Sequence, residues 1–150
     1  MTHIDFTALA ERIGQEVAVS PWLDVTQERI NAFAEATEDR QWIHVDPVKA
    51  AAHSPFKSTI AHGFLTLSLV SVLLRTAMTV TVKMAINYGV NRVRFVSAVP
   101  VGSRLRGRFT PRAVDTVDGG GVQVTWNITV EREGQEKPAA VVEWIVRYYP

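Results

Sequence analysis

Apolar and polar positions divide the chain into a helical first half and a strand-rich second half. In 26–38, the residues that recur on one helical face are Ile30, Phe33, Ala34 and Thr37. Thr26 can cap this helix with its side-chain oxygen. Asp46-Pro47 has the form of a cap and a first helical residue, which predicts a short second helix ending at Ala52. Residues 17–25 precede both helices, contain Pro21 and are predicted to form at best an edge strand.

A third helix is predicted over 63–77, and its first part, 63–74, carries no charged residue. Its large apolar residues are Phe64, Leu65, Leu67, Leu69, Val70, Val72, Leu73 and Leu74. Because they are spread over most of the helix circumference, this helix must be covered on nearly every side. The uncharged stretch is well short of the roughly 20 residues that a membrane span needs. We therefore predict a buried core helix.

Four long strands are predicted to follow this helix. They span 83–96, 104–117, 122–132 and 139–149, with turns at 100–102, 118–121 and 132–137. In the third strand, apolar residues from Val122 to Val130 alternate with polar ones, as in an antiparallel strand with one solvated face. A long apolar helix followed by such strands predicts an α+β fold in one domain over 1–150. In this arrangement, that of a hotdog fold, a curved antiparallel sheet wraps one long central helix.

Composition excludes several classes of function. Lys and Arg number 16 against 15 Asp and Glu, so the net charge of +1 gives no field that would attract nucleic acid or an anionic membrane. The absence of cysteine excludes disulfides, thiolate zinc sites and a cysteine nucleophile. Asp5 and Glu11 lie where a signal peptide would have a basic flank and an apolar run, so we expect a cytoplasmic protein.

Asp39 and His44 are the first candidates for chemistry. They lie five residues apart on the connector between the two short helices, where a turn can bring a carboxylate and an imidazole to one small molecule. The pair suits general acid–base catalysis, because histidine titrates near neutral pH and a carboxylate can orient it or exchange a proton itself. Spacing alone favours the alternative, in which Asp39 is a helix-end residue and His44 a hydrogen-bonded loop residue.

Gly63, at the start of the long helix, is the second candidate. Backbone N–H groups in a first helical turn have no intrahelical partner, so Gly63 can offer a donor to a developing oxyanion. Alternatively, Gly63 only lets the chain turn into a crowded helix, which is the simpler explanation when the residue is considered alone.

Two further groups of residues are candidates for ligand sites. His44, His53 and His62 with Asp46 could form a metal site, but they lack the i, i+4 spacing that places ligands on one helical face, so we expect no metal. Alternating arginines at Arg104, Arg106 and Arg108, and also Arg92 and Arg94, could meet coenzyme A phosphates. For the alternating set, a solvated outer sheet face is the favoured interpretation.

Several motifs together resemble those of a known family. Asp39-x-x-x-x-His44, followed by Val45-Asp46-Pro47, and Ala61-His62-Gly63-Phe64 resemble the MaoC-like (R)-specific enoyl-CoA hydratases of the hotdog superfamily. Asn87-Tyr88-Gly89, Val93-Arg94-Phe95 and Pro100-Val101-Gly102 are similar to the hairpin that follows the central helix in that family. The resemblance covers about 14–149.

The resemblance implies roles for individual residues. Asp39 and His44 correspond to the catalytic dyad, and Gly63 corresponds to the glycine whose N–H forms the oxyanion hole. Ser71, eight residues after Gly63, stands nearest to a serine that contacts the dyad or the substrate in some members. The sequence departs from the family where Gln41-Trp42 replaces Asn-Pro and Glu38 replaces Gly. These changes, with Gln41 and Trp42 as possible substrate contacts, affect the pocket shape and hence acyl-chain preference.

The resemblance also implies the activity. The expected reaction is the reversible hydration of trans-2-enoyl-CoA to (R)-3-hydroxyacyl-CoA in fatty acid metabolism, with an acyl-CoA thioester as substrate and no metal or cofactor. Two alternatives stay open: a hotdog acyl-CoA thioesterase and a non-catalytic acyl-CoA binding module. The thioesterase is disfavoured, because its carboxylate usually lies on the central helix and 63–74 contains neither Asp nor Glu. Exposed strand edges and the resemblance together predict a homodimer with the active site near its interface.

Overall fold

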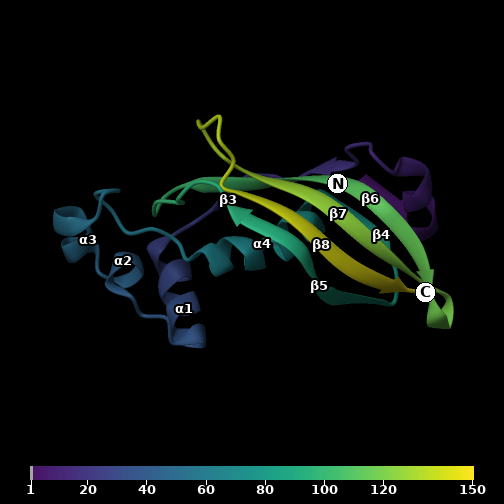
Figure 1. The fold of residues 1–150 in the computed structure, drawn as a ribbon, viewed down its shortest axis with the longest axis horizontal. Helices are drawn as coiled ribbons and strands as arrows, with labels where there is room; N and C mark the ends of the chain where they lie inside the picture. The colour runs from purple at the N-terminus through teal and green to yellow at the C-terminus, as the bar shows by residue number, and fades with distance from the viewer. Residues whose placement is uncertain (1) are drawn as a thin grey trace.

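A long helix, α4 (Gly63–Ala77), lies against a curved antiparallel sheet in the computed structural model, which describes residues 2–150 (Figure 1). The sheet strands, in spatial order, are β2 (Ala18–Val19), β6 (Arg104–Val117), β7 (Gly121–Arg132), β8 (Ala140–Tyr149) and β5 (Met84–Phe95), and β3 (Leu23–Asp24) also pairs with β6. This confirms the predicted α+β arrangement. The edge segment is broken at Pro21, as expected, into β2 and β3.

The short helices gather beyond one end of α4, opposite the end where the C-terminus lies (Figure 1). They are α1 (Gln27–Thr37), α2 (Trp42–Val45) and α3 (Pro47–His53). Both predicted caps form: the Thr26 hydroxyl accepts from the Arg29 N–H at 3.2 Å, and the Asp46 carboxylate accepts from the Lys49 N–H at 2.9 Å. Helix α2 was not predicted, because a single turn is too short to show a helical period.

The first residues form structure that the sequence pattern did not predict. Strand β1 (Thr2–Asp5) pairs in parallel with β4 (Met78–Thr81), which directly follows α4. A 3-10 helix, η1 (Phe6–Arg12), then buries Phe6 and Leu9 in the core. A second 3-10 turn, η2 (Asp118–Gly120), joins β6 to β7 with Gly119 and Gly120 at φ 80° and 74°, a backbone conformation that favours glycine.

The hydrophobic core lies between α4 and the concave face of the sheet. Leu65, Leu69 and Leu73 of α4 are buried, as are the inward-facing residues of β7. Trp126 of β7 is fully buried, and its indole N–H donates to the hydroxyl of Tyr148 at 3.3 Å. The alternation seen in the sequence of β7 thus reports which face of the sheet meets the helix.

Cover of α4 on nearly every side was expected, and this expectation is wrong for the isolated chain. The sheet leaves one face of the helix open, so that Phe64 is 69% exposed and Ser68, Ser71 and Arg75 are also exposed. Strand β5 beside it, at the edge of the sheet, is exposed at every residue except Gly89 and Val93. An open helix face, which is polar apart from Phe64, and an open strand edge therefore adjoin each other.

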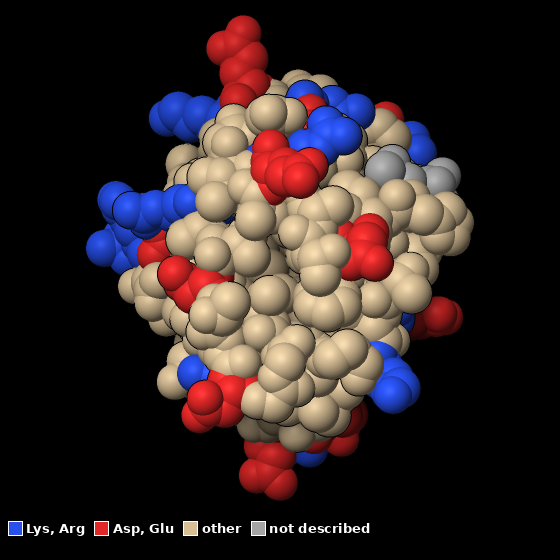
Figure 2. Space-filling view, turned by 90° about the vertical axis from the view of Figure 1, so that its right-hand side faces the viewer, with Lys and Arg blue, Asp and Glu red and all other residues tan. Residues whose placement is uncertain are grey.

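Charge is not concentrated on the face shown in Figure 2, which views the molecule from the end that carries the C-terminus. There, acidic and basic side chains are spread around the margin, and uncharged residues fill the middle. No helix in the described part of the chain is long and apolar enough to cross a membrane. The surface thus agrees with the near-zero net charge of the sequence.

Burial raises the pKa of Tyr148 to about 12, which predicts a specific loss of stability at alkaline pH. Above pH 10 the unfolded chain releases the phenolic proton while the folded protein keeps it, so the free energy of unfolding falls as pH rises from 10 towards 12. Between pH 9 and 11.5 the free energy of unfolding of the wild type should fall by about 2 kcal/mol more than that of Tyr148→Phe. Denaturant unfolding at both pH values measures this, with the less buried Tyr149→Phe as control; equal losses in wild type and Tyr148→Phe would contradict it.

Candidate active site

His44 is held in a defined orientation on α2. Its ring is 8% exposed, and its Nδ1 lies 2.7 Å from the carbonyl oxygen of Ile60. Because a carbonyl oxygen only accepts hydrogen bonds, Nδ1 carries the hydrogen of the neutral ring and Nε2 is left as an acceptor. The single helical turn and the Ile60 carbonyl therefore present an unprotonated nitrogen to the site.

The backbone of His44 is fixed by an amide side chain. Gln27 Nε2 donates to the His44 carbonyl at 2.8 Å and to Asn31 Oδ1 at 2.9 Å. The buried hydroxyl of Thr59 donates to Gln27 Oε1 at 2.5 Å. This network ties the start of α1 to α2 and to the segment that leads into α4. The bonds from Gln27 to His44 and from Thr59 to Gln27 are not readable from the sequence, because they join residues far apart along the chain.

Asp39 lies just after α1, which ends at Glu38 in a left-handed conformation with φ 61°. Its carboxylate is exposed and makes no hydrogen bond within residues 2–150. The neighbouring Arg40 pairs instead with Glu35, at 2.9 and 3.0 Å, and these bonds lower the pKa of the Glu35 carboxyl. A carboxylate oxygen of Asp39 and ring nitrogens of His44 and His62 all lie within 4.8 Å of one another. The structure thus brings Asp39 and His44 together.

His62 is the residue of this cluster to which sequence reasoning gave no catalytic role. Its ring stacks on that of His44, with centroids 3.8 Å apart and planes inclined by 23°. Its Nε2 lies 2.9 Å from the backbone carbonyl of Asp39, to which it donates. His62 entered the sequence analysis only as part of a motif and of the disfavoured metal set. No periodic signal links two residues on separate elements.

The cluster has the ligand types of a metal site but not the geometry. Imidazole lone pairs lie in the ring planes, and the planes of His44 and His62 are nearly parallel. One ion cannot lie in both planes at the 2.0–2.1 Å that is typical of a zinc–imidazole bond. His53, at the exposed end of α3, does not belong to the cluster. The arrangement instead suits a small donor such as water.

Gly63 begins α4 directly after His62. Its N–H has no intrahelical acceptor, whereas the N–H of Leu65 donates to the His62 carbonyl at 3.1 Å. It lines a cavity of about 240 Å³ together with Thr66, Phe95 and Val99. A Cβ atom on Gly63 would lie 2.8 Å from ring carbons of Phe95. The close approach of Phe95 thus explains why position 63 is a glycine. This explanation is compatible with a role for the Gly63 N–H as a donor to an oxyanion.

Of the remaining candidates, Ser71 lies on α4 outside the cluster, whereas Gln41 and Trp42 lie between Asp39 and His44 in the chain. Ser71 is exposed, donates to the Ser68 carbonyl at 3.2 Å and lines a cavity of about 390 Å³ that also touches Met78 and Tyr148. Gln41 is the exposed residue before α2 and makes no capping bond with its side chain. Trp42 is partly buried, with the Lys49 ammonium 5.0 Å from its ring. Ser71 thus borders an apolar cavity that is not lined by Asp39 or His44 of the same chain. In this position it can contact a substrate but not the dyad of its own chain.

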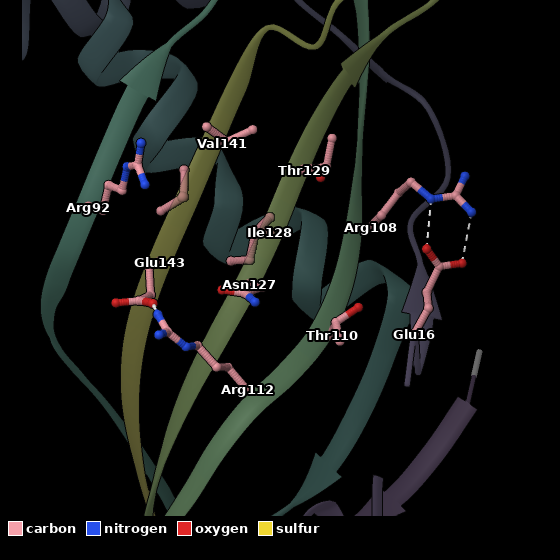
Figure 3. Close-up of a pocket in the computed structure, with 11 residues that line it drawn as sticks. Glu16, Arg92, Arg108, Thr110, Arg112, Asn127, Ile128, Thr129, Val141 and Glu143 are labelled. Atoms are coloured by element: carbon pink, nitrogen blue, oxygen red, sulfur yellow. Dashed lines mark hydrogen bonds and ion pairs between the residues drawn. The ribbon is translucent and has the colours of Figure 1, made fainter. Parts of the chain in front are cut away.

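The alternating arginines of β6 are paired with carboxylates. Arg104 bonds to Glu133 at 3.0 Å, Arg106 to Glu131 at 2.5 Å and Arg108 to Glu16 at 2.7 Å. Figure 3 shows the outer face of the sheet, where the Arg108–Glu16 pair and an Arg112–Glu143 pair border a cavity of about 450 Å³. Because these carboxylates already engage the guanidinium groups, the pairing supports a solvated face over a phosphate site.

Comparison with known proteins identifies the family. The family model described as MaoC like domain matches residues 8–147. The chain belongs to the MaoC-like domain family. Its relative in Mycobacterium tuberculosis, 3-hydroxyacyl-thioester dehydratase Z, is 54% identical over 141 residues, which are 93% of each chain. Nodulation protein N of Rhizobium meliloti is 45% identical over 147 residues, or 97% of this chain and 91% of that one.

A solved structure supports the same assignment. An (R)-hydratase from A. caviae, involved in PHA biosynthesis, shares 28% sequence identity and a TM-score of 0.69 over 92% of this chain and 96% of that one. The hotdog fold predicted from the sequence is thereby confirmed. The MaoC-like protein is a member of a dehydratase family, and its class of enzyme is the hydro-lyases.

The Gln27 network predicts that Gln27→Glu destabilises the MaoC-like protein. The substituted carboxylate cannot donate to the His44 carbonyl, which leaves that buried acceptor unpaired and costs about 1–3 kcal/mol. Asn31→Asp is the matched control, because aspartate still accepts from Gln27 and removes no bond. Denaturant unfolding measures the free energy of unfolding of both variants. Equal stability of the two variants would show that the Gln27–His44 bond does not hold α2.

Proposed function

We propose that this enzyme hydrates trans-2-enoyl-CoA to (R)-3-hydroxyacyl-CoA and catalyses the reverse dehydration in fatty acid metabolism. The observation that carries the proposal is the meeting of the Asp39 carboxylate and the His44 ring within 4.8 Å, beside the first turn of α4. The dehydratase name of the relative that is 54% identical supports the same reaction. Asp39 and His44 form the catalytic dyad, and Gly63 supplies the oxyanion donor.

The two groups suit activation of one water molecule. His44 offers its bare Nε2 and Asp39 offers its exposed carboxylate, so a water between them can donate a hydrogen to each. Its lone pair then faces C3 of the enoyl group. As the C3–O bond forms, one of the two groups takes a proton from water and the dyad returns a proton to C2. The enoyl double bond is lost, and the thioester is restored when the enolate carbonyl reforms.

Negative charge passes through the thioester oxygen during this reaction. The N–H of Gly63, at the positive end of α4, is the group that stabilises the charge. Loss of one such donor typically lowers the rate by about 10²–10³. The small cavity beside Gly63 gives the thioester oxygen a route to this donor.

The rival functions differ in measurable products. Crotonyl-CoA is incubated with the enzyme while enoyl absorbance and free thiol are followed separately. Hydration removes the absorbance without releasing thiol, whereas a thioesterase releases thiol and a binding module does neither. Because Asp39 and His44 come from one connector, both act from one side of the substrate, and addition in deuterated water is syn. The (R) configuration of the product is what the resemblance to the (R)-specific hydratases implies. An (S) product, or thiol release without hydration, would refute the proposal.

Removal of either proton-transfer group is expected to lower hydration by roughly 10²–10⁴. Asp39→Asn keeps the size of an exposed side chain and removes its basicity. His44→Asn keeps a donor near the Ile60 carbonyl while removing Nε2, which is a sharper change than alanine at this buried position. Turnover of crotonyl-CoA, with a thermal melt for each variant, measures the effect.

Two variants at the two ends of α3 serve as controls. Asp46→Asn preserves the cap of α3, because asparagine caps as well as aspartate, and His53→Asn replaces an exposed histidine. Both should turn over crotonyl-CoA at nearly the wild-type rate. Wild-type turnover in Asp39→Asn or His44→Asn would exclude that residue from the dyad.

We also propose that the enzyme is a homodimer whose interface covers β5 and the open face of α4. The exposed apolar residues there include Phe64, Met84, Ile86, Tyr88, Val90, Phe95 and Val96. Strand β5 has unpaired backbone groups along its free edge, which a second copy of the strand can satisfy. The cavity that Ser71 borders opens beside this surface, which supports an active site near the interface.

Light scattering at micromolar concentration is expected to give the mass of a dimer. Val90→Lys places a charge within the apolar surface and should shift the mass towards the monomer. Val48→Lys on α3, where the side chain is already 83% exposed, is the matched control and should leave the mass unchanged. A monomeric wild type with full activity would contradict the proposed dimer.

A further inference from the structure

We propose that His62 is a positioning residue, which fixes Asp39 through its Nε2–H and supports the ring of His44. The proposal rests on the proposed function, in which Asp39 and His44 transfer protons. His62 is only 3% exposed, so it reaches bulk solvent poorly and acts on the dyad from within the protein. Its contacts involve both members of the dyad, which no other described side chain does.

The first contact fixes the position of Asp39. His62 Nε2 donates to the Asp39 carbonyl at 2.9 Å, and it is the one side chain within residues 2–150 that bonds to Asp39. The surrounding segment, 38–41, is exposed, and its internal bond runs from the Arg40 N–H to the Glu38 carbonyl. Without the histidine bond, Asp39 itself is held by no side chain, and its distance from His44 depends on an exposed turn that is tied through the Arg40–Glu35 pair and the bond from the His44 N–H to the Gln41 carbonyl.

The second contact supports the ring of His44. The stacked rings of His44 and His62 lie 3.8 Å apart, and Phe33 lies on His62 with centroids 5.0 Å apart. The Ile60 carbonyl holds one ring nitrogen of His44, and the stack limits tilting about that bond. The stacked ring of His62 therefore helps to set the direction in which the bare Nε2 of His44 points.

A third observation argues against a role in packing alone. Because Nε2 of His62 carries the hydrogen, its Nδ1 is an acceptor, and this buried atom has no partner among the described residues. A buried unpartnered acceptor lowers the free energy of unfolding, whereas an apolar ring would fill the same space without that cost. The Nε2–H donor is the feature that an apolar ring cannot supply.

Three substitutions separate the donor from the ring. His62→Phe keeps the stack and removes the donor, so kcat for crotonyl-CoA should fall about 10–100-fold with KM changed less than about twofold. His62→Gln places an amide near the position of Nε2 and should recover most of the activity. His62→Asn has the same chemistry but places its amide near Nδ1, too short to reach the Asp39 carbonyl, and should not recover it.

A double-mutant cycle shows whether His62 acts through Asp39. If it does, adding His62→Phe to Asp39→Asn produces little further loss of hydration, whereas independent roles produce multiplied losses. Multiplied losses, wild-type kcat in His62→Phe, or equal activity of the Gln and Asn variants would overturn the proposal.

Amide hydrogen exchange over 38–46 tests the same positioning without the reaction. Faster exchange in His62→Phe and His62→Asn but not in His62→Gln supports the proposal, and unchanged exchange in all three overturns it. Absence of hydration by the wild type would refute the proposed function alone, since this measurement does not depend on turnover.

Discussion

Burial of the apolar face of α4 against the curved sheet is the constraint on which the site depends. Leu65, Leu69 and Leu73 fix the rotation of the helix and its place along the sheet. Its first turn therefore begins directly after His62, which lies in one cluster with Asp39 and His44. The packing of α4 in the core thus fixes the position of the polar cluster next to its N-terminal end.

The polar centre beyond α4 is rich in acceptors. His44 donates through Nδ1 and His62 through Nε2, each to a backbone carbonyl, so each ring keeps one bare nitrogen. The bare nitrogen of His44 and the exposed carboxylate of Asp39 favour a ligand that donates hydrogen bonds, whereas Nδ1 of His62 is buried. Backbone carbonyls select the tautomers of both rings. Such a site is prepared for water before any substrate arrives.

Local periodicity was enough to predict most of the elements but not the site. The bounds predicted for α4 and β6 match the structure. The β1–β4 pair and the stack of His44 on His62 join segments far apart in sequence, and no local pattern reports such contacts. The all-round apolar sequence of α4 predicted cover, but a pattern cannot distinguish cover by the same chain from cover by another.

The contact between Gly63 and Phe95 limits how such proteins can diverge. The end of β5 meets the start of α4 so closely that a Cβ at position 63 would lie 2.8 Å from the aromatic ring. A larger residue at 63 is admissible only if position 95 becomes smaller or its side chain turns away. The two positions therefore form a size-exchange pair, and a larger residue at the start of α4 requires a smaller or reoriented side chain at the end of the neighbouring strand.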